Sequence, residues 1–140
     1  MESVIIDALN SAYISAITHA KNETKCCHLG CTLIINGKVD STYTNNPERH
    51  AEIEALSSFG GANIEALRFL DCNLVIVRTL KDGKKTMAKP CKKCLPIIKK
   101  HGIKFVFYTN WEGTLVQERA AHMESTHIST LDNLKEKAKN

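Results

Sequence analysis

The stretch Pro90-Cys91-Lys92-Lys93-Cys94 carries two thiols three positions apart. Because a proline suits the first turn of a helix, we expect a helix to start at Pro90-Cys91 and to bring both thiols to one face, within reach of a single ion. The amino terminus of a helix also stabilises thiolates, which are the form that binds zinc. Taken alone, a Cys-x-x-Cys pair is also typical of a redox motif or of half of a structural zinc site.

The stretch His50-Ala51-Glu52 supplies the groups that the cysteine pair lacks. A structural zinc site needs four protein ligands, and no cysteine follows Cys94 in the chain. With His50, the two cysteines make a three-ligand site with an open fourth position, where a bound water can have a pKa of about 7. Glu52 can stay outside the metal shell and carry protons between that water and a substrate. The residues therefore predict a catalytic zinc site with His50, Cys91 and Cys94 as ligands and Glu52 as the acid–base catalyst.

The combination of His-x-Glu with Pro-Cys-x-x-Cys is the signature of zinc-dependent nucleobase deaminases. From about Cys27 to about Gly113 the chain resembles the cytidine and deoxycytidylate deaminase superfamily. Residues 30–44 resemble the hairpin that precedes the family's zinc motif, and residues 103–108 resemble the strand after its cysteine helix. The resemblance implies a three-layer α/β fold with a five-stranded mixed sheet flanked by helices, and one zinc ion in its crevice.

The resemblance also implies which residues contact a substrate. Asn45 would contact the sugar, the backbone N–H of Ala51 would bind the pyrimidine carbonyl, and the carbonyl near Lys89 would accept a hydrogen bond from the leaving amine. Asn46 is the alternative to Asn45 for the first of these roles. Trp111 is either a further substrate contact or a packed or rim aromatic residue. Family members usually associate, so a homo-oligomer is expected.

The elements that must position these residues follow from the period of the apolar side chains. Apolar residues at spacings near three and four predict an amphipathic helix over 4–20. Asn36-Gly37 predicts a type I′ turn between two strands that span residues 31–43. A second helix is expected from near His50 to Phe59, and residues 64–70 either extend or restart it.

The second half of the chain alternates between strand and helix patterns. Leu74-Val75-Ile76-Val77 predicts a buried strand, and residues 81–84 predict the turn after it. The cysteine helix should end near His101-Gly102, and residues 103–108 alternate like a strand. Residues 131–139 look helical, and His127-Ile128-Ser129 is a short candidate for the family's fifth strand. Strand–helix–strand units predict a mixed sheet with helices on its faces, in a single domain over residues 1–140.

The composition agrees with one ordinary globular domain. Of the 140 residues, 43% are hydrophobic and 24% are charged, which excludes a disordered or fibrous chain. The amino terminus has an acid where a signal peptide has basic residues, and no apolar stretch approaches the roughly 20 residues of a membrane span. We therefore expect a cytoplasmic protein that does not enter a membrane. The six cysteines should then be thiols or metal ligands.

The remaining cysteines and histidines have less specific surroundings. Cys31 and Cys72 fall in predicted strands and are expected in the core. The cluster Cys26-Cys27-His28 is either a set of half-buried residues at a hairpin entrance or a second metal site. The other histidines lack a second ligand at metal spacing and are expected to be structural or exposed; they are His101, His122 and His127.

These observations predict hydrolytic deamination of a cytosine nucleoside or nucleotide (cytidine, deoxycytidine or dCMP) to the uracil product and ammonia. A small substrate is favoured over a polynucleotide because arginines are sparse, no aromatic-interleaved basic strip is present, and lysine runs such as Lys99-Lys100 are expected to be solvated. The alternatives are a tRNA-type adenosine or a polynucleotide cytosine deaminase and, from another class, a non-catalytic zinc-binding or regulatory module. Glu52 distinguishes the last, because a purely structural site has no use for that carboxylate.

Overall fold

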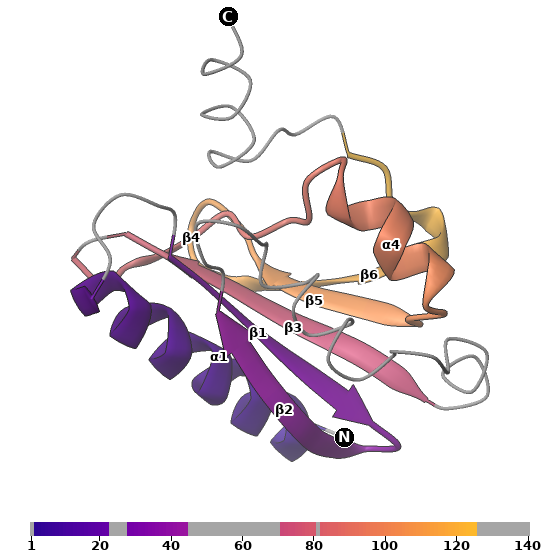
Figure 1. The fold of residues 1–140 in the computed structure, drawn as a ribbon, viewed down its shortest axis with the longest axis horizontal. Helices are drawn as coiled ribbons and strands as arrows, with labels where there is room; N and C mark the ends of the chain where they lie inside the picture. Colours follow the sequence, from indigo (N-terminus) through magenta and orange to yellow (C-terminus); the bar gives the residue numbers. More distant parts are fainter. Residues whose placement is uncertain (1, 23–27, 45–70, 81, 126–140) are drawn as a thin grey trace, which may run out of the picture.

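The computed structural model describes residues 2–22, 28–44, 71–80 and 82–125 of the chain. The predicted second helix and the last predicted helical turns lie outside these residues. The described elements, labelled as in Figure 1, are α1 (Glu2–Asn22), β1 (His28–Ile35), β2 (Lys38–Thr44), β3 (Cys72–Thr79), β4 (Lys85–Thr86), α4 (Cys94–Lys100), β5 (Phe105–Thr109), β6 (Leu115–Arg119) and the short 3₁₀ helix η1 (Ala120–His122).

One mixed sheet joins the described strands in the order β2-β1-β3-β5-β6, and the two-residue β4 pairs with β3. β1 is antiparallel to both β2 and β3, β3 is parallel to β5, and β5 is antiparallel to β6. β2, β3 and β5 therefore run in the same direction, and their last residues, Thr44, Thr79 and Thr109, lie at the same edge of the sheet. Open α/β sheets bind their ligands outside this edge.

The β1–β2 hairpin turns as its sequence predicts. Asn36 and Gly37 have φ angles of 50° and 77°, which are the positive values that a type I′ turn requires. The carbonyl of Asp71 accepts a hydrogen bond from the backbone N–H of Asn36, and the Asn36 side chain accepts one from the N–H of Asp71. The turn is thereby attached to the start of β3.

Helix α1 covers one face of the sheet (Figure 1). Its residues Ala8, Ala12 and Ala16 are fully buried, and small side chains at this spacing let the helix approach the strands closely. The approach is closest at Gly30 of β1, where a methyl group in place of the glycine hydrogen would have no room beside the helix backbone at Ala12. On this face Ile34, Val75 and Phe107 form a buried cluster with Ala8.

Helix α4 and η1 cover the opposite face (Figure 1). Leu74, Ile76 and Val106 of the sheet pack with Leu95 and Ile98 of α4 in a second buried cluster. Burial of these apolar side chains holds the layers together, at about 25 cal/mol per Å² of apolar surface removed from water. The arrangement is helix, sheet, helix, so the predicted α/β class with a mixed sheet flanked by helices is confirmed.

The start of the cysteine helix and the strand β6 differ from the sequence prediction. The cysteine helix begins at Cys94 rather than at Pro90-Cys91, because Lys92 and Lys93 form a turn. A strand that the residue pattern did not predict, β6, follows β5 through a turn at residues 110–114. The sequence candidate for a fifth strand, His127-Ile128-Ser129, lies outside the described residues.

Candidate metal centre

A loop of residues 87–93 carries Cys91 from β4 to the start of α4. The backbone N–H of Ala88 donates to the carbonyl of Thr109 at 2.8 Å. The hydroxyl of Thr109 donates in turn to the carbonyl of Thr86 at 2.6 Å. These bonds attach the loop to the carboxyl end of β5, at the edge of the sheet where the parallel strands end.

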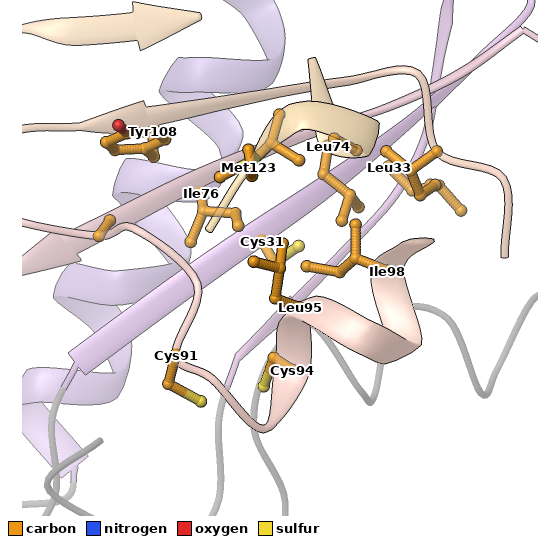
Figure 2. Packing of buried hydrophobic residues seen from close by; sticks show 14 of the residues in the cluster. Cys31, Leu33, Leu74, Ile76, Cys91, Cys94, Leu95, Ile98, Tyr108 and Met123 are labelled. Carbon is orange, nitrogen blue, oxygen red and sulfur yellow. The ribbon is translucent and has the colours of Figure 1, made fainter. Parts of the chain in front are cut away.

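The two cysteines belong to a single hydrogen-bonded turn. The carbonyl of Cys91 accepts the backbone N–H groups of Cys94 and Leu95, both at 3.1 Å. Both cysteines are buried, with 4% of Cys91 and none of Cys94 exposed. Figure 2 shows their side chains at the beginning of α4, with the apolar Leu95 and Ile98 further into the core. Cys91 precedes the helix, and the bonds to its carbonyl keep the two residues adjacent at the start of α4.

Lys89 is the other sequence-predicted site residue that the structure describes, and it is half-buried in the same loop. The predicted ligand His50, the predicted proton carrier Glu52 and the predicted substrate contacts Asn45 and Ala51 all lie outside the described residues. In the described part of the chain no group of three or more His, Cys, Asp or Glu side chains could hold a metal ion. Of the predicted zinc ligands, the described residues include Cys91 and Cys94.

The chemistry of this donor pair fits zinc. Thiolates are soft ligands that favour zinc over hard cations such as magnesium or calcium, and a pair from one turn is the usual half of a zinc site. Lys92 and Lys93, which lie between the two cysteines in the sequence, are exposed. A zinc ion would still need at least one further protein ligand from another part of the chain.

Beside the cysteine loop, Glu118 of β6 joins two other side chains. The hydroxyl of Tyr108 donates to Glu118 Oε2 at 2.5 Å, and Lys89 Nζ lies 3.7 Å from the same oxygen. The pKa of Tyr108 is raised to about 12. The largest cause is burial of the phenol, followed by the hydrogen bond to Glu118 and the charge of that carboxylate. Tyr108 therefore stays a neutral donor over the whole physiological range.

Sequence reasoning did not identify Glu118, because β6 was not predicted. The sequence Leu115-Val116-Gln117-Glu118-Arg119 does not alternate in polarity, and only the two-residue period of a strand places Glu118 on the face occupied by Val116. That face is the one α4 covers, where Tyr108 also lies.

The other buried cysteines and histidines that the structure describes are Cys31, Cys72, His28 and His101. Cys31 and Cys72 are fully buried in the core, as predicted. The pKa of the Cys72 thiol is raised, mainly by burial and to a smaller extent by the nearby Asp71 charge. His28 is buried in β1. His101 is buried with its Nδ1 2.9 Å from the Ile97 carbonyl.

The predictions for the remaining residues have mixed outcomes. His122 is exposed, as expected, while Cys26, Cys27 and His127 lie outside the described residues. The Lys99 side chain is exposed but donates from Nζ to the Met123 carbonyl at 2.7 Å, so it is not simply a solvated charge.

Trp111 lies in the turn between β5 and β6 and is 68% exposed. It borders an open cavity of about 540 Å³ together with Tyr13 of α1 and Lys85 of β4. Packing of Trp111 in the core is therefore excluded, and its contact with a substrate stays a prediction.

Comparison with protein-family models, with curated proteins and with solved structures found no match. No helix of the described residues is long and apolar enough to cross a membrane.

Proposed function

We propose that this chain is a zinc-dependent hydrolytic deaminase of a cytosine nucleoside or nucleotide, as its resemblance to the cytidine and deoxycytidylate deaminase superfamily implies. The observation that carries the proposal is the turn that holds Cys91 and Cys94 together, buried, at the start of α4. Its loop is attached to Thr109, at the edge of the sheet where a ligand site is expected.

The topology supports a contribution from His50 to the same centre. β2 ends at Thr44 at the edge where the cysteine loop is attached, and His50 follows six residues later in the sequence. β2 and β5 are separated by three strand spacings, or about 14 Å. Six residues can span up to about 20 Å, so the chain is long enough to reach from Thr44 to the end of β5, where the cysteine loop is attached.

In the proposed centre His50, Cys91 and Cys94 would hold the zinc ion. When bound, zinc would supply a Lewis acid that activates a water molecule at neutral pH. Glu52 would take the proton of the attacking water and deliver it to the ring nitrogen next to the carbon that carries the amino group. It would then assist the departing amine, so that cytosine and water give uracil and ammonia.

The substrate contacts are part of the same proposal. Asn45 immediately follows the last residue of β2, and Lys89 lies two residues before Cys91, so the sequence positions of both favour contact with a substrate at this edge. The Asn45 amide would bind the sugar, the Ala51 N–H would bind the pyrimidine carbonyl, and the carbonyl near Lys89 would accept the leaving amine's hydrogen bond. Two hydrogen bonds to the base would give selectivity for a cytosine ring.

A product screen with the purified, zinc-supplemented protein tests the proposal. The compounds are cytidine, deoxycytidine, dCMP, cytosine, a tRNA anticodon stem and a single-stranded oligonucleotide, and the measurement is conversion to the deaminated product. We expect turnover of a free cytosine nucleoside or nucleotide. Turnover of only the tRNA stem or the oligonucleotide would overturn the substrate class, and turnover of none would favour a non-catalytic zinc-binding module.

A further inference from the structure

The geometry points to Glu118 as a positioning residue that fixes the cysteine loop by holding Lys89 against the sheet. This inference rests on the proposed function, since it concerns the loop that would hold zinc. Glu118 belongs to β6, whereas Lys89 belongs to the loop two residues before Cys91, so the contact joins an edge strand to the candidate metal centre.

The loop has backbone attachments on either side of Lys89 and a side-chain attachment at Lys89 itself. On the amino-terminal side, Thr86 and Ala88 are bonded to Thr109. On the carboxyl-terminal side, the carbonyl of Cys91 accepts the first N–H groups of α4. Between these bonds, the ammonium of Lys89 lies 3.7 Å from Glu118 Oε2. The ion pair therefore restrains the segment that leads directly into Cys91.

Glu118 is itself held in place, and this distinguishes it from an ordinary surface carboxylate. The buried Tyr108 hydroxyl donates to the same Oε2 atom that faces Lys89. Most surface ion pairs contribute little because two long side chains must be ordered. Here the carboxylate is already ordered by Tyr108, and both paired side chains are about one-third exposed, at 30% and 35%. When the ion pair forms, most of the conformational entropy that is lost therefore comes from the Lys89 side chain.

Groups that orient a metal-bearing segment without touching the metal commonly change metal affinity by about 10–100-fold when they are removed. Glu118→Gln keeps an oxygen acceptor for Tyr108 but removes the charge that attracts Lys89. Lys89→Met removes the ammonium and keeps a long side chain. If the pair acts as one unit, each single variant should weaken zinc binding by about 10-fold, and the double variant should be no weaker than either single one.

The experiment is a zinc titration of the full-length chain against a competing chelator, with Co²⁺ as a second probe whose thiolate absorption reports the two cysteines directly. Glu112→Gln, in the neighbouring turn, is the matched control because Glu112 is exposed, and it should bind zinc within about twofold of the unmutated protein. Circular dichroism confirms that each variant is folded. Unchanged zinc affinity in both Glu118→Gln and Lys89→Met, or strictly additive losses, would overturn the inference.

A second measurement separates this inference from the proposed function. In metal-free protein, hydrogen exchange at the Ala88 amide should be faster in Glu118→Gln and Lys89→Met than in the unmutated chain, while amides of β3 keep their rates. If the unmutated protein bound no zinc but this difference were seen, the proposed function would fail and the positioning role would stand. Equal Ala88 exchange rates in all proteins would remove the positioning role.

Discussion

Cys91 and Cys94 are as buried as residues of an ordinary apolar core, and they share a cluster with Leu95 and Ile98. A buried cysteine that only packs is inert, whereas a zinc ligand must be a thiolate, and burial away from a metal disfavours the charged form. A zinc ion between two thiolates would neutralise them and remove this cost. Substitution of these cysteines can therefore distinguish a role in core packing from a role in zinc binding.

The first prediction concerns metal content. Purified protein should hold about one zinc ion per chain, and Cys91→Ala or Cys94→Ala should each abolish it, because fewer than three protein ligands would remain. Elemental analysis by mass spectrometry measures the ratio. Cys31→Ala is the matched control, since Cys31 is equally buried in the same cluster and should leave the zinc content unchanged. Equal zinc content in all three variants would contradict the site.

Tyr108 provides a prediction about pH. The pKa of this phenol is raised from 10.0 to about 12 by burial, then by the hydrogen bond to Glu118 and its charge. The folded protein thus keeps the Tyr108 proton where the unfolded chain loses it. The resulting stabilisation is fully present below pH 10 and is lost as the pH rises from 10 towards about 12.

Urea unfolding of the unmutated protein and of Tyr108→Phe, repeated at increasing pH, measures this effect. The free energy of unfolding of the unmutated protein should fall more steeply above pH 10 than that of Tyr108→Phe, which has no phenolic proton. Parallel curves for the two proteins would show that Tyr108 titrates alike in the folded and unfolded chains.

Among the elements, the contact between α1 and β1 depends most on one small residue. A Cβ atom on Gly30 would lie 1.9 Å from the carbonyl oxygen of Ala12, a distance that requires the helix or the strand to move. Gly30→Ala should therefore reduce the free energy of unfolding by about 3 kcal/mol or more. Denaturant unfolding followed by circular dichroism measures the change.

Gly37→Ala is the matched control for this prediction. A Cβ atom on Gly37 has open space around it, but φ is +77°, so the expected cost is only the backbone strain of about 1–2 kcal/mol. A smaller loss in Gly30→Ala than in Gly37→Ala would show that α1 and β1 do not pack this closely.

Elements whose determinants are local could be predicted from the sequence. The Asn36-Gly37 turn needs only two residues with positive φ, and α1 shows the helical spacing of Ala8, Ala12 and Ala16. β6 was not predicted, because an edge strand of five residues with only half-buried apolar positions has no continuous apolar run. The sequence prediction starts α4 too early, because a Pro90 signal does not show that Lys92 and Lys93 form a turn before the helix.

In the candidate site, too, local contacts could be predicted from the sequence and distant contacts could not. The proximity of Cys91 and Cys94 is a local property, and their spacing predicted it. The contacts of Glu118 with Lys89 and Tyr108 depend on the pairing of β5 with β6. No periodic pattern in the sequence relates residues that are 29 positions apart, such as Lys89 and Glu118. Such partners become visible only when the sheet order is known.

At the scale of the whole molecule, the shared direction of β2, β3 and β5 gives the fold one edge at which separate segments can meet. The cysteine loop is attached there through Thr109, and the chain leaves β2 there at Thr44, just before the His50-Ala51-Glu52 motif. A fold of this kind can combine ligands from distant positions in the sequence without a disulfide or a second domain. We propose that such a combination makes this chain a deaminase.

The most direct test of this claim is the turnover of a cytosine nucleoside or nucleotide by zinc-loaded Glu52→Gln beside the unmutated protein. Glutamine keeps the shape of the side chain but cannot cycle a proton, so we predict that turnover falls by at least about 10²–10⁴-fold while the zinc content and the circular dichroism spectrum stay the same. Turnover by Glu52→Gln equal to that of the unmutated protein, or its loss only together with zinc and fold, would contradict the role assigned to Glu52 and with it the proposed mechanism.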